Sequence, residues 1–201
     1  MFTGIVHEVG TVVGVERSRQ LVRLTVAAPK TAARLESLDS VAVHGVCLTV
    51  IERAQGAMRF EVIPETQQVT TLGTIRRGDR VHLEPSLRLC DRLGGHVLLG
   101  HVDGTGTILT RQERGGALVW RLRVAQALRR LLVPKGPVAL DGVSLTVGGA
   151  LTGATVTVHL IPETLRQTTF AARRVGDRVN IELDYLAKLV RHFLHQRSTG
   201  G

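Results

Sequence analysis

Residues 41–50 read VAVHGVCLTV, and residues 138–147 read VALDGVSLTV, with seven of the ten positions identical. A second, longer segment is repeated in the same order: residues 62–84 and residues 160–182 are identical at twelve of 23 positions. The offset between the copies stays at 97 to 98 residues, so the chain is a tandem duplication of a unit of about half its length. This period is much longer than that of solenoid repeats. The sequence therefore predicts two similar domains that carry two similar pockets.

Strand signals occur at equivalent places in the two copies. Apolar and polar residues alternate over residues 21–27 (LVRLTVA) and again over residues 119–124 (VWRLRV). The Asp-Gly step at Asp141 lies between two apolar runs, which is typical of a hairpin. Turn signals at regular spacing indicate about six short strands in each copy. We therefore predict an all-β fold of tandem duplicated six-stranded antiparallel β-barrels, since closure of a barrel leaves no exposed sheet edge.

The end of the chain departs from the repeat. Residues 185–196 (YLAKLVRHFLHQ) carry apolar residues at helical i, i+3, i+4 spacing and have no counterpart in the first copy. Such a helix must bury its apolar stripe against its own barrel or against copies of itself. The predicted organisation is an N-terminal barrel over residues 1–97, a C-terminal barrel over residues 98–184, a helix over residues 185–196 and a disordered tail over residues 197–201.

The composition argues against several classes of protein. The net charge is +9, but the arginines are scattered and aromatic residues make up only 3%, so a nucleic-acid-binding surface is not indicated. No apolar run approaches membrane-spanning length and the N-terminus does not resemble a signal peptide, so we expect a cytoplasmic protein. Cys47 and Cys90 are expected to be free thiols, and no cluster of residues has the spacing of metal ligands.

Several motifs together resemble the riboflavin synthase family of the alpha-chain type. They are the N-terminal MFTGIV, the paired GVCLTV and GVSLTV, the paired IPET, the GGHVLLGHVDG run over residues 94–104 and the DYLAKLV run over residues 184–190. The match covers essentially the whole chain, in order. The resemblance implies a transferase without a cofactor that forms a homotrimer through its C-terminal helices. The basic surface is compatible with docking to lumazine synthase.

The reaction that the resemblance implies is the last step of riboflavin biosynthesis. Two molecules of 6,7-dimethyl-8-ribityllumazine bind in one active site, and one transfers a four-carbon unit to the other. The products are riboflavin and 5-amino-6-ribitylaminouracil. The C7 methyl group is already acidic, and its conjugate base is an exomethylene nucleophile. The protein then has to hold two rings face to face and to move protons, and the N-terminal barrel of one subunit would face the C-terminal barrel of a neighbour.

The resemblance also assigns substrate-binding residues by position. Backbone amides and carbonyls of the strands would bind the pyrimidine-like edge of the ring. In the N-terminal pocket the assigned residues are Gly4, Ile5, Val6, Ser40, Cys47, Leu48, Thr49, Glu61, Val62, Ile63, Pro64, Glu65 and Thr66. In the C-terminal pocket they are Gly100, His101, Val102, Lys135, Ser144, Leu145, Thr146, His159, Leu160, Ile161, Pro162, Glu163 and Thr164. Phe2 either covers the site or anchors the core.

Differences between the copies indicate catalytic residues, since two pockets that bind one ligand in two roles diverge in this way. Cys47 stands opposite Ser144, and Ile5 stands opposite His101. Cys47 is either a thiol or thiolate that activates the ring or an apolar contact. Ser144 is expected to orient a water that adds to C7 of the acceptor. His101 is either a proton carrier, with His96 as a weaker candidate, or a structural residue.

Three further residues complete the catalytic candidates. Lys135 either stabilises a developing anion or is a solvated loop residue. Asp184 either binds the ribityl chain or acts as an acid or base, or it caps the final helix. Thr146 and its counterpart Thr49 are matched hydroxyls, although each alone would be an ordinary strand threonine.

One position departs from the family. His44 stands where the family has Asn or Asp before Gly; histidine tolerates a positive φ, so we expect the turn to persist with altered hydrogen bonds. The alternative function is a non-catalytic lumazine- or flavin-binding protein of the same fold, in which one pocket decays. Both pockets here keep their residues, which favours the enzyme, and one bound ligand per chain would favour the binding protein.

Overall fold

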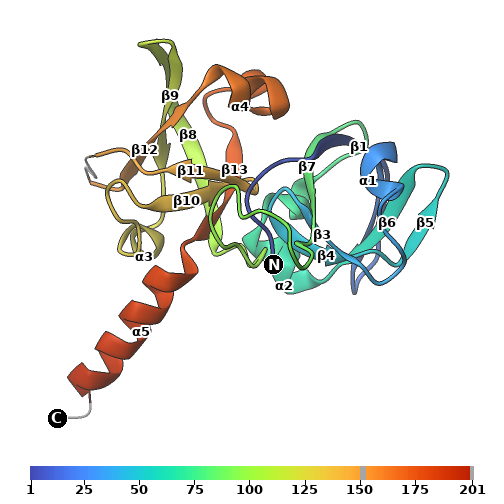
Figure 1. The fold of residues 1–201 in the computed structure, drawn as a ribbon, viewed down its shortest axis with the longest axis horizontal. Helices are drawn as coiled ribbons and strands as arrows, with labels where there is room; N and C mark the ends of the chain where they lie inside the picture. Colours follow the sequence, from blue (N-terminus) through green and yellow to red (C-terminus); the bar gives the residue numbers. More distant parts are fainter. Residues whose placement is uncertain (150–152, 200–201) are drawn as a thin grey trace.

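A computed structural model describes residues 1–149 and 153–199, apart from the side chains of residues 195 and 197–199. Each copy of the repeat forms one antiparallel sheet (Figure 1). The N-terminal sheet consists of β1 (Glu8–Arg17), β2 (Val22–Ala27), β3 (Ser40–Val43), β4 (Val46–Thr49), β5 (Glu52–Ala54), β6 (Ala57–Val62) and β7 (Arg80–Pro85). The C-terminal sheet consists of β8 (Gly104–Arg114), β9 (Ala117–Arg123), β10 (Pro137–Leu140), β11 (Val143–Thr146), β12 (Thr155–Leu160) and β13 (Arg178–Leu183).

The two sheets share one topology, which confirms the predicted all-β duplication. Their strand orders are β4-β3-β7-β1-β2-β6-β5 and β11-β10-β13-β8-β9-β12. In the first sheet β4 and β5 stand at opposite ends of the order, yet only Val50 and Ile51 separate them in the chain, so the sheet curls closed. In the second sheet a bridge between Val147 and Val158 closes the same gap. The extra strand β5 arises because the chain after β4 continues alongside β6.

Each barrel encloses its own apolar core. Met58 and Phe60 lie in the N-terminal core, and Trp120 and Phe170 lie in the C-terminal core. A third, small cluster of Phe2, Ala42, Leu98 and Ala139 lies between the barrels. Ala42 belongs to β3 and Ala139 to β10, so this cluster joins equivalent strands of the two copies.

Short helices connect the strands. They are α1 (Pro29–Ala32), α2 (Pro64–Val69), η1 (Thr71–Thr74), α3 (Gln126–Arg129), α4 (Pro162–Gln167) and η2 (Phe170–Ala172). Helices α2 and α4, which begin within the repeated IPET motif, were not predicted from the sequence. Both have proline as the first helical residue and glutamate in the first turn, which is a common way for a helix to begin.

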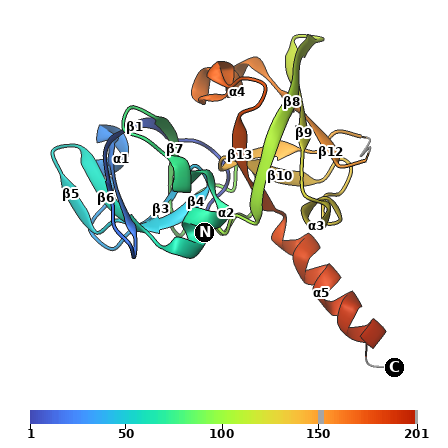
Figure 2. The ribbon, with the colours of Figure 1, turned by 180° about the vertical axis from the view of Figure 1, so that it is seen from behind.

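Helix α5 (Tyr185–Thr199) is longer than predicted and extends away from both barrels (Figure 2). The predicted helical end at residue 196 is wrong, and so is the disorder assigned to residues 197–199, because these residues are helical. The physical reason is that no glycine or proline interrupts the chain before Gly200. Residues 200 and 201 of the predicted tail lie outside the described residues. Among the described residues, no helix is long and apolar enough to cross a membrane.

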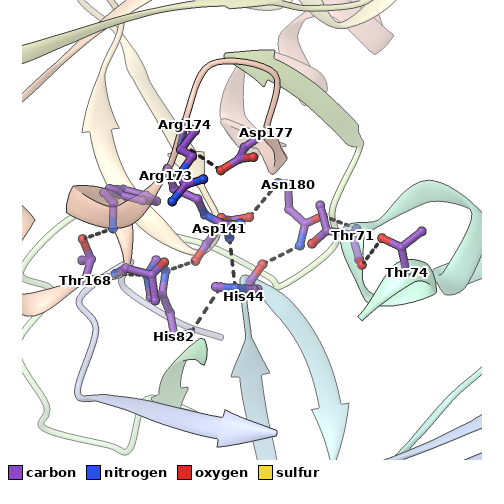
Figure 3. A network of polar contacts seen from close by, with 12 residues as sticks. His44, Thr71, Thr74, His82, Asp141, Thr168, Arg173, Arg174, Asp177 and Asn180 are labelled. Carbon is purple, nitrogen blue, oxygen red and sulfur yellow. Dashed lines mark hydrogen bonds and ion pairs between the residues drawn. The ribbon is translucent and has the colours of Figure 1, made fainter. Parts of the chain in front are cut away.

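A buried polar network joins the hairpin β3–β4 to the hairpin β10–β11 (Figure 3). The backbone N–H of Asn180 donates to Oδ1 of Asp141 at 2.7 Å, and at the equivalent place the N–H of His82 donates to Nδ1 of His44 at 3.2 Å. His44 therefore keeps the acceptor role that Asp141 has in the second copy. Gly45 and Gly142 lie back to back, since a Cβ atom on Gly45 would lie 2.6 Å from the nitrogen of Gly142.

The same network links the two barrels, because each barrel donates a hydrogen bond to the turn of the other. Asn180 Nδ2 donates to the carbonyl of His44 at 2.8 Å, and His82 Nδ1 lies 2.9 Å from the carbonyl of Asp141, to which it donates. The N–H of Thr169 donates to His82 Nε2 at 2.9 Å. Arg173 adds an ion pair of 2.8 Å to the fully buried Asp141. Because His44 and His82 each accept a backbone hydrogen bond, the network requires both rings to be neutral.

Acid should destabilise this interface. Burial lowers the pKa of His44 to about 3, with a further contribution from the positive charge of Arg173. Burial also lowers the pKa of His82 to about 3, with His44 as the next cause. Both values lie below that of an unfolded histidine, about 6.5. The stability that the neutral rings contribute is therefore present above pH 6.5 and is lost as the pH falls from 6.5 toward 3.

We expect His44→Asn to reduce the slope of unfolding free energy against pH between pH 6.5 and 4. The reduction should be about one proton, or about 1.4 kcal/mol per pH unit, because one neutral buried ring is removed. Urea unfolding at a series of pH values measures the slope. His192→Asn on the exposed surface of α5 is the matched control and should leave the slope unchanged. Parallel curves for the wild type and His44→Asn would contradict the prediction.

Candidate functional site

Two equivalent segments of the chain cross from one barrel to the other. These exchanged segments are residues 3–6 and residues 99–102. The N–H of Ser144 on β11 donates to the carbonyl of Gly4 at 2.9 Å, and the N–H of Cys47 on β4 donates to the carbonyl of Gly100 at 2.9 Å. Val6 packs against the C-terminal core, and Val102 packs against the N-terminal core.

The predicted division of residues between the two pockets is therefore wrong. Residues 4–6 lie beside Ser144 rather than Cys47, and residues 100–102 lie beside Cys47 rather than Ser144. The approach is close, because a Cβ atom on Gly4 or on Gly100 would lie 2.6 Å from the Cβ of Ser144 or Cys47 respectively. Sequence comparison could not detect the exchange, since swapping two equivalent segments leaves the pattern of the repeat unchanged.

The Cys47 site lies at the end of the N-terminal barrel where β4 meets β6. Cys47 is half-buried and Thr49 is exposed, and Ser40 on β3 stands directly opposite Thr49. His101, which follows Gly100 in the exchanged segment, is exposed. Ile63, between β6 and α2, is also exposed, so this end of the barrel presents both apolar and polar groups to a ligand.

The Ser144 site is its counterpart at the end of the C-terminal barrel. Ser144 is half-buried and Thr146 is exposed on β11. Ile5 from the exchanged segment and Ile161 between β12 and α4 are exposed apolar residues. Lys135 belongs to the adjoining loop, where its N–H donates to the carbonyl of Val147 at 3.1 Å, and its side chain is exposed.

His96, the weaker of the two histidine candidates in the sequence, is a hydrogen-bond partner of Ser144. His96 Nδ1 lies 2.7 Å from the hydroxyl oxygen of Ser144. The preceding Gly95 allows this approach, because a Cβ atom there would lie 2.2 Å from the carbonyl of Thr3 and 2.8 Å from the Ser144 hydroxyl. The Gly-Gly-His order was the available signal, since glycine permits close contact with a neighbouring backbone.

The environment of His96 favours a neutral ring. Burial lowers its pKa, while the negative charge of Asp184 opposes that shift. Nε2 of the ring is buried and has no hydrogen-bond partner among the described residues. A neutral imidazole whose Nδ1 faces a hydroxyl can accept the hydroxyl proton, which is the arrangement needed to activate a hydroxyl or a water molecule.

Some predicted site residues have structural roles in the described chain. Phe2 is 1% exposed and belongs to the cluster between the barrels, so it anchors the core. Asp184 accepts a hydrogen bond of 3.3 Å from the N–H of Leu186 and so caps the start of α5. The side chains of Leu48, Val62 and Leu160 face the cores, which leaves only their backbone atoms to contact a ligand.

Two predicted carboxylates form surface ion pairs. Glu61 pairs with Arg23 at 3.0 Å, and Glu163 pairs with Arg166 within α4. Neither pair is buried, so neither carboxylate is fixed in place by the fold. The remaining predicted positions (Pro64, Glu65, Thr66, His159, Pro162 and Thr164) surround the starts of α2 and α4, and Leu145 contacts the C-terminal core.

A cleft of 770 Å³ lies between the barrels on the side of η1 and η2. Its lining includes Arg80, Arg166, Arg173 and Arg178, and none of the predicted site residues. Arg173 and Arg166 are already paired with carboxylates. The ends of the two barrels, where the predicted residues gather, therefore remain the candidate site.

Comparison with known proteins identifies the class to which the duplicated fold belongs. A family model described as the lumazine binding domain matches residues 3–86 and again residues 99–184, one match in each copy. The chain thus belongs to the class of proteins with tandem lumazine binding domains. Among solved structures, LumP complexed with riboflavin is similar with a TM-score of 0.85 and 21% identity, covering 92% of this chain and all of that chain. LumP complexed with 6,7-dimethyl-8-(1'-D-ribityl) lumazine is similar with a TM-score of 0.82.

Curated relatives are more similar in sequence. Riboflavin synthase of Mycobacterium bovis is 42% identical over the full length of both chains. Riboflavin synthase of Bacillus subtilis is 39% identical over 98% of this chain and 91% of its own length. The chain belongs to the riboflavin synthase family.

The charge of Asp184 should be measurable at His96. We expect Asp184→Asn to lower the pKa of His96 further, because the negative charge that favours the imidazolium is removed. Titration of the imidazole signals by NMR gives the pKa directly. Asp91→Asn, which removes an exposed carboxylate of the linker between the barrels, serves as the control. A His96 pKa that rises in Asp184→Asn, or that moves equally in both variants, would show that the carboxylate does not act on the ring.

Proposed function

We propose that this chain is a riboflavin synthase that converts two molecules of 6,7-dimethyl-8-ribityllumazine into riboflavin and 5-amino-6-ribitylaminouracil by transfer of a four-carbon unit. The observation that carries the proposal is the pair of equivalent sites that differ in their reactive group. One site has the thiol of Cys47, and the other has the hydroxyl of Ser144 with His96. When two molecules of one substrate take two chemical roles, both sites need the same backbone arrangement to bind the substrate. The two sites also need different side chains to give each molecule its role.

The family relatives and the structural neighbours support the substrate. Full-length relatives at about 40% identity are riboflavin synthases, and LumP is known in complexes with a lumazine, riboflavin and flavin mononucleotide. In this chain the Ser144–His96 pair would hold and deprotonate a water that adds to the acceptor ring. Cys47 and His101 would contact the second ring from the opposite site. Thr49, Thr146 and Lys135 would bind polar groups of the two ligands.

The chain should form one riboflavin for every two lumazine molecules consumed, with no other substrate added. Absorbance of riboflavin measures the product. We expect Ser144→Ala and His96→Gln each to lower kcat by 10²-fold or more, because positioned proton transfer contributes about 10²–10⁴-fold to catalysis. Cys90→Ser is the matched control, since Cys90 is an exposed linker residue. Binding of one lumazine per chain without turnover would instead identify a ligand-carrying protein.

We also propose that the chain assembles as a homotrimer through α5. Leu186, Val190, Phe193 and Leu194 are 60–66% exposed and follow the i, i+4, i+7, i+8 spacing of one helix face. A helix that projects from the molecule with an uncovered apolar face needs a partner, and identical helices supply one in a symmetric oligomer. Cytoplasmic location and docking to lumazine synthase are part of the same proposal, the latter consistent with the net charge of +9.

Replacing Phe193 by aspartate should convert the trimer into monomers, because a charge would have to be buried in the helix contact. Light scattering coupled to gel filtration measures the mass. Arg191→Asp changes the charge on the same helix at a less apolar position and is the control. A mass of one chain for the wild type, or a trimeric Phe193→Asp variant, would show that this helix face does not hold the assembly.

A further inference from the structure

Each barrel contains one buried glutamate near the end of its last strand. Glu84 on β7 is 5% exposed and Glu182 on β13 is 4% exposed. The two occupy the same place in the repeat, because Glu84 aligns with Glu182 at the 98-residue offset. A buried carboxylate is costly unless its oxygens accept hydrogen bonds. The partners of these two residues therefore indicate why they are present.

Both carboxylates bind backbone N–H groups of the exchanged segments. Glu84 accepts from the N–H of Thr3 at 2.6 Å, from the hydroxyl of Thr3 at 2.7 Å and from the N–H of Gly4 at 3.0 Å. Glu182 accepts from the N–H of Leu99 at 2.8 Å and from the N–H of Gly100 at 3.1 Å. Hydrogen bonds to a carboxylate are stronger than those between neutral groups, so each pair of bonds fixes two consecutive peptide groups.

The fixed peptide groups lead directly into the two candidate sites. Gly4 and Gly100 adopt positive φ angles of 80° and 74°, so the chain turns there. Their carbonyls then accept from Ser144 and Cys47 at 2.9 Å, and the next residues are Ile5 and His101. Each glutamate thus belongs to one barrel and fixes a segment against the reactive residue of the other barrel.

We propose that Glu84 and Glu182 are positioning residues of the two sites: Glu84 holds residues 3–6 at Ser144, and Glu182 holds residues 99–102 at Cys47. The placement of the two exchanged segments follows from the hydrogen bonds, whereas the effect of that placement on catalysis rests on the proposed function. Neither carboxylate is a catalytic residue, because each acts through the segment that it binds. The pairing is specific, so loss of one glutamate should disturb one site and leave the other in place.

Thiol labelling tests the pairing without reference to activity. In a Cys90→Ser background, Cys47 is the remaining thiol, and its reaction with 5,5'-dithiobis(2-nitrobenzoic acid) reports how well residues 99–102 cover it. We expect Glu182→Gln to raise the labelling rate of Cys47 at least fivefold, because the amide offers one acceptor and places an NH₂ group against a backbone N–H. Glu84→Gln, the matched control, should change the rate less than twofold.

A second variant keeps the test decisive if Glu182→Gln does not fold. Gly100→Ala would place a methyl group 2.6 Å from the Cβ of Cys47 and should displace the same segment, with the same rise in labelling. An equal rise in Glu84→Gln and Glu182→Gln would overturn the proposal, since it would indicate general loosening of the fold. An unchanged labelling rate of Cys47 in both Glu182→Gln and Gly100→Ala would overturn the proposal as well.

Kinetics test the catalytic consequence. We expect Glu84→Gln and Glu182→Gln each to lower kcat at least tenfold at a temperature where both remain folded. Glu52→Gln, which makes the same chemical change at an exposed glutamate paired with Arg59 and outside both exchanged segments, should keep the wild-type kcat. Unchanged kcat in both glutamine variants would overturn the positioning role and leave the proposed function intact. Absence of turnover in the wild type would overturn the proposed function, and labelling would then decide the pairing alone.

Discussion

The exchange of residues 3–6 and 99–102 between the barrels is the constraint on which the other features depend. In each exchanged segment a buried glutamate accepts from the backbone N–H of the glycine, and a strand of the opposite barrel donates to the carbonyl of the same glycine. Between the two segments, Phe2 and Leu98 form a two-way backbone bridge with bonds of 2.8 and 3.0 Å. Neither candidate site is complete within one copy of the repeat, so the two barrels have to be docked before either site exists.

The docking itself uses the most polar part of the interior. His44 and Asp141 occupy equivalent turns, accept equivalent backbone hydrogen bonds and expose their carbonyls to the opposite barrel. The glycines that follow them approach so closely that a side chain on either would meet backbone atoms. This combination fixes the angle between the barrels through directional bonds, whereas an apolar contact alone would allow sliding. The small cluster around Phe2 then excludes water from the same interface.

The two sites share a backbone frame and differ in their side chains. The imidazole of His96 lies at hydrogen-bond distance from Ser144. Cys47 lies against the apolar cluster between the barrels and binds the backbone of Gly100, which His101 follows in the chain. Under the proposed function, the repeated frame lets both sites bind one kind of ring, and the differing reactive groups give two identical molecules different roles. The exposed apolar face of α5 is the surface through which we propose that the chain assembles.

The sequence alone determined the duplication, the all-β class and the terminal helix. These follow from local patterns, namely identity at a fixed offset, period-two alternation and helical spacing, which need no knowledge of what lies opposite in space. The membership of each site could not be predicted. Exchange of two equivalent segments leaves the sequence pattern of the repeat unaltered, so Ile5 could not be assigned to Ser144 or His101 to Cys47. The hydrogen bonds of His96, Glu84 and Glu182 were decided by tertiary structure for a related reason: each joins residues at least 48 positions apart, and contacts at that separation depend on how the whole chain folds.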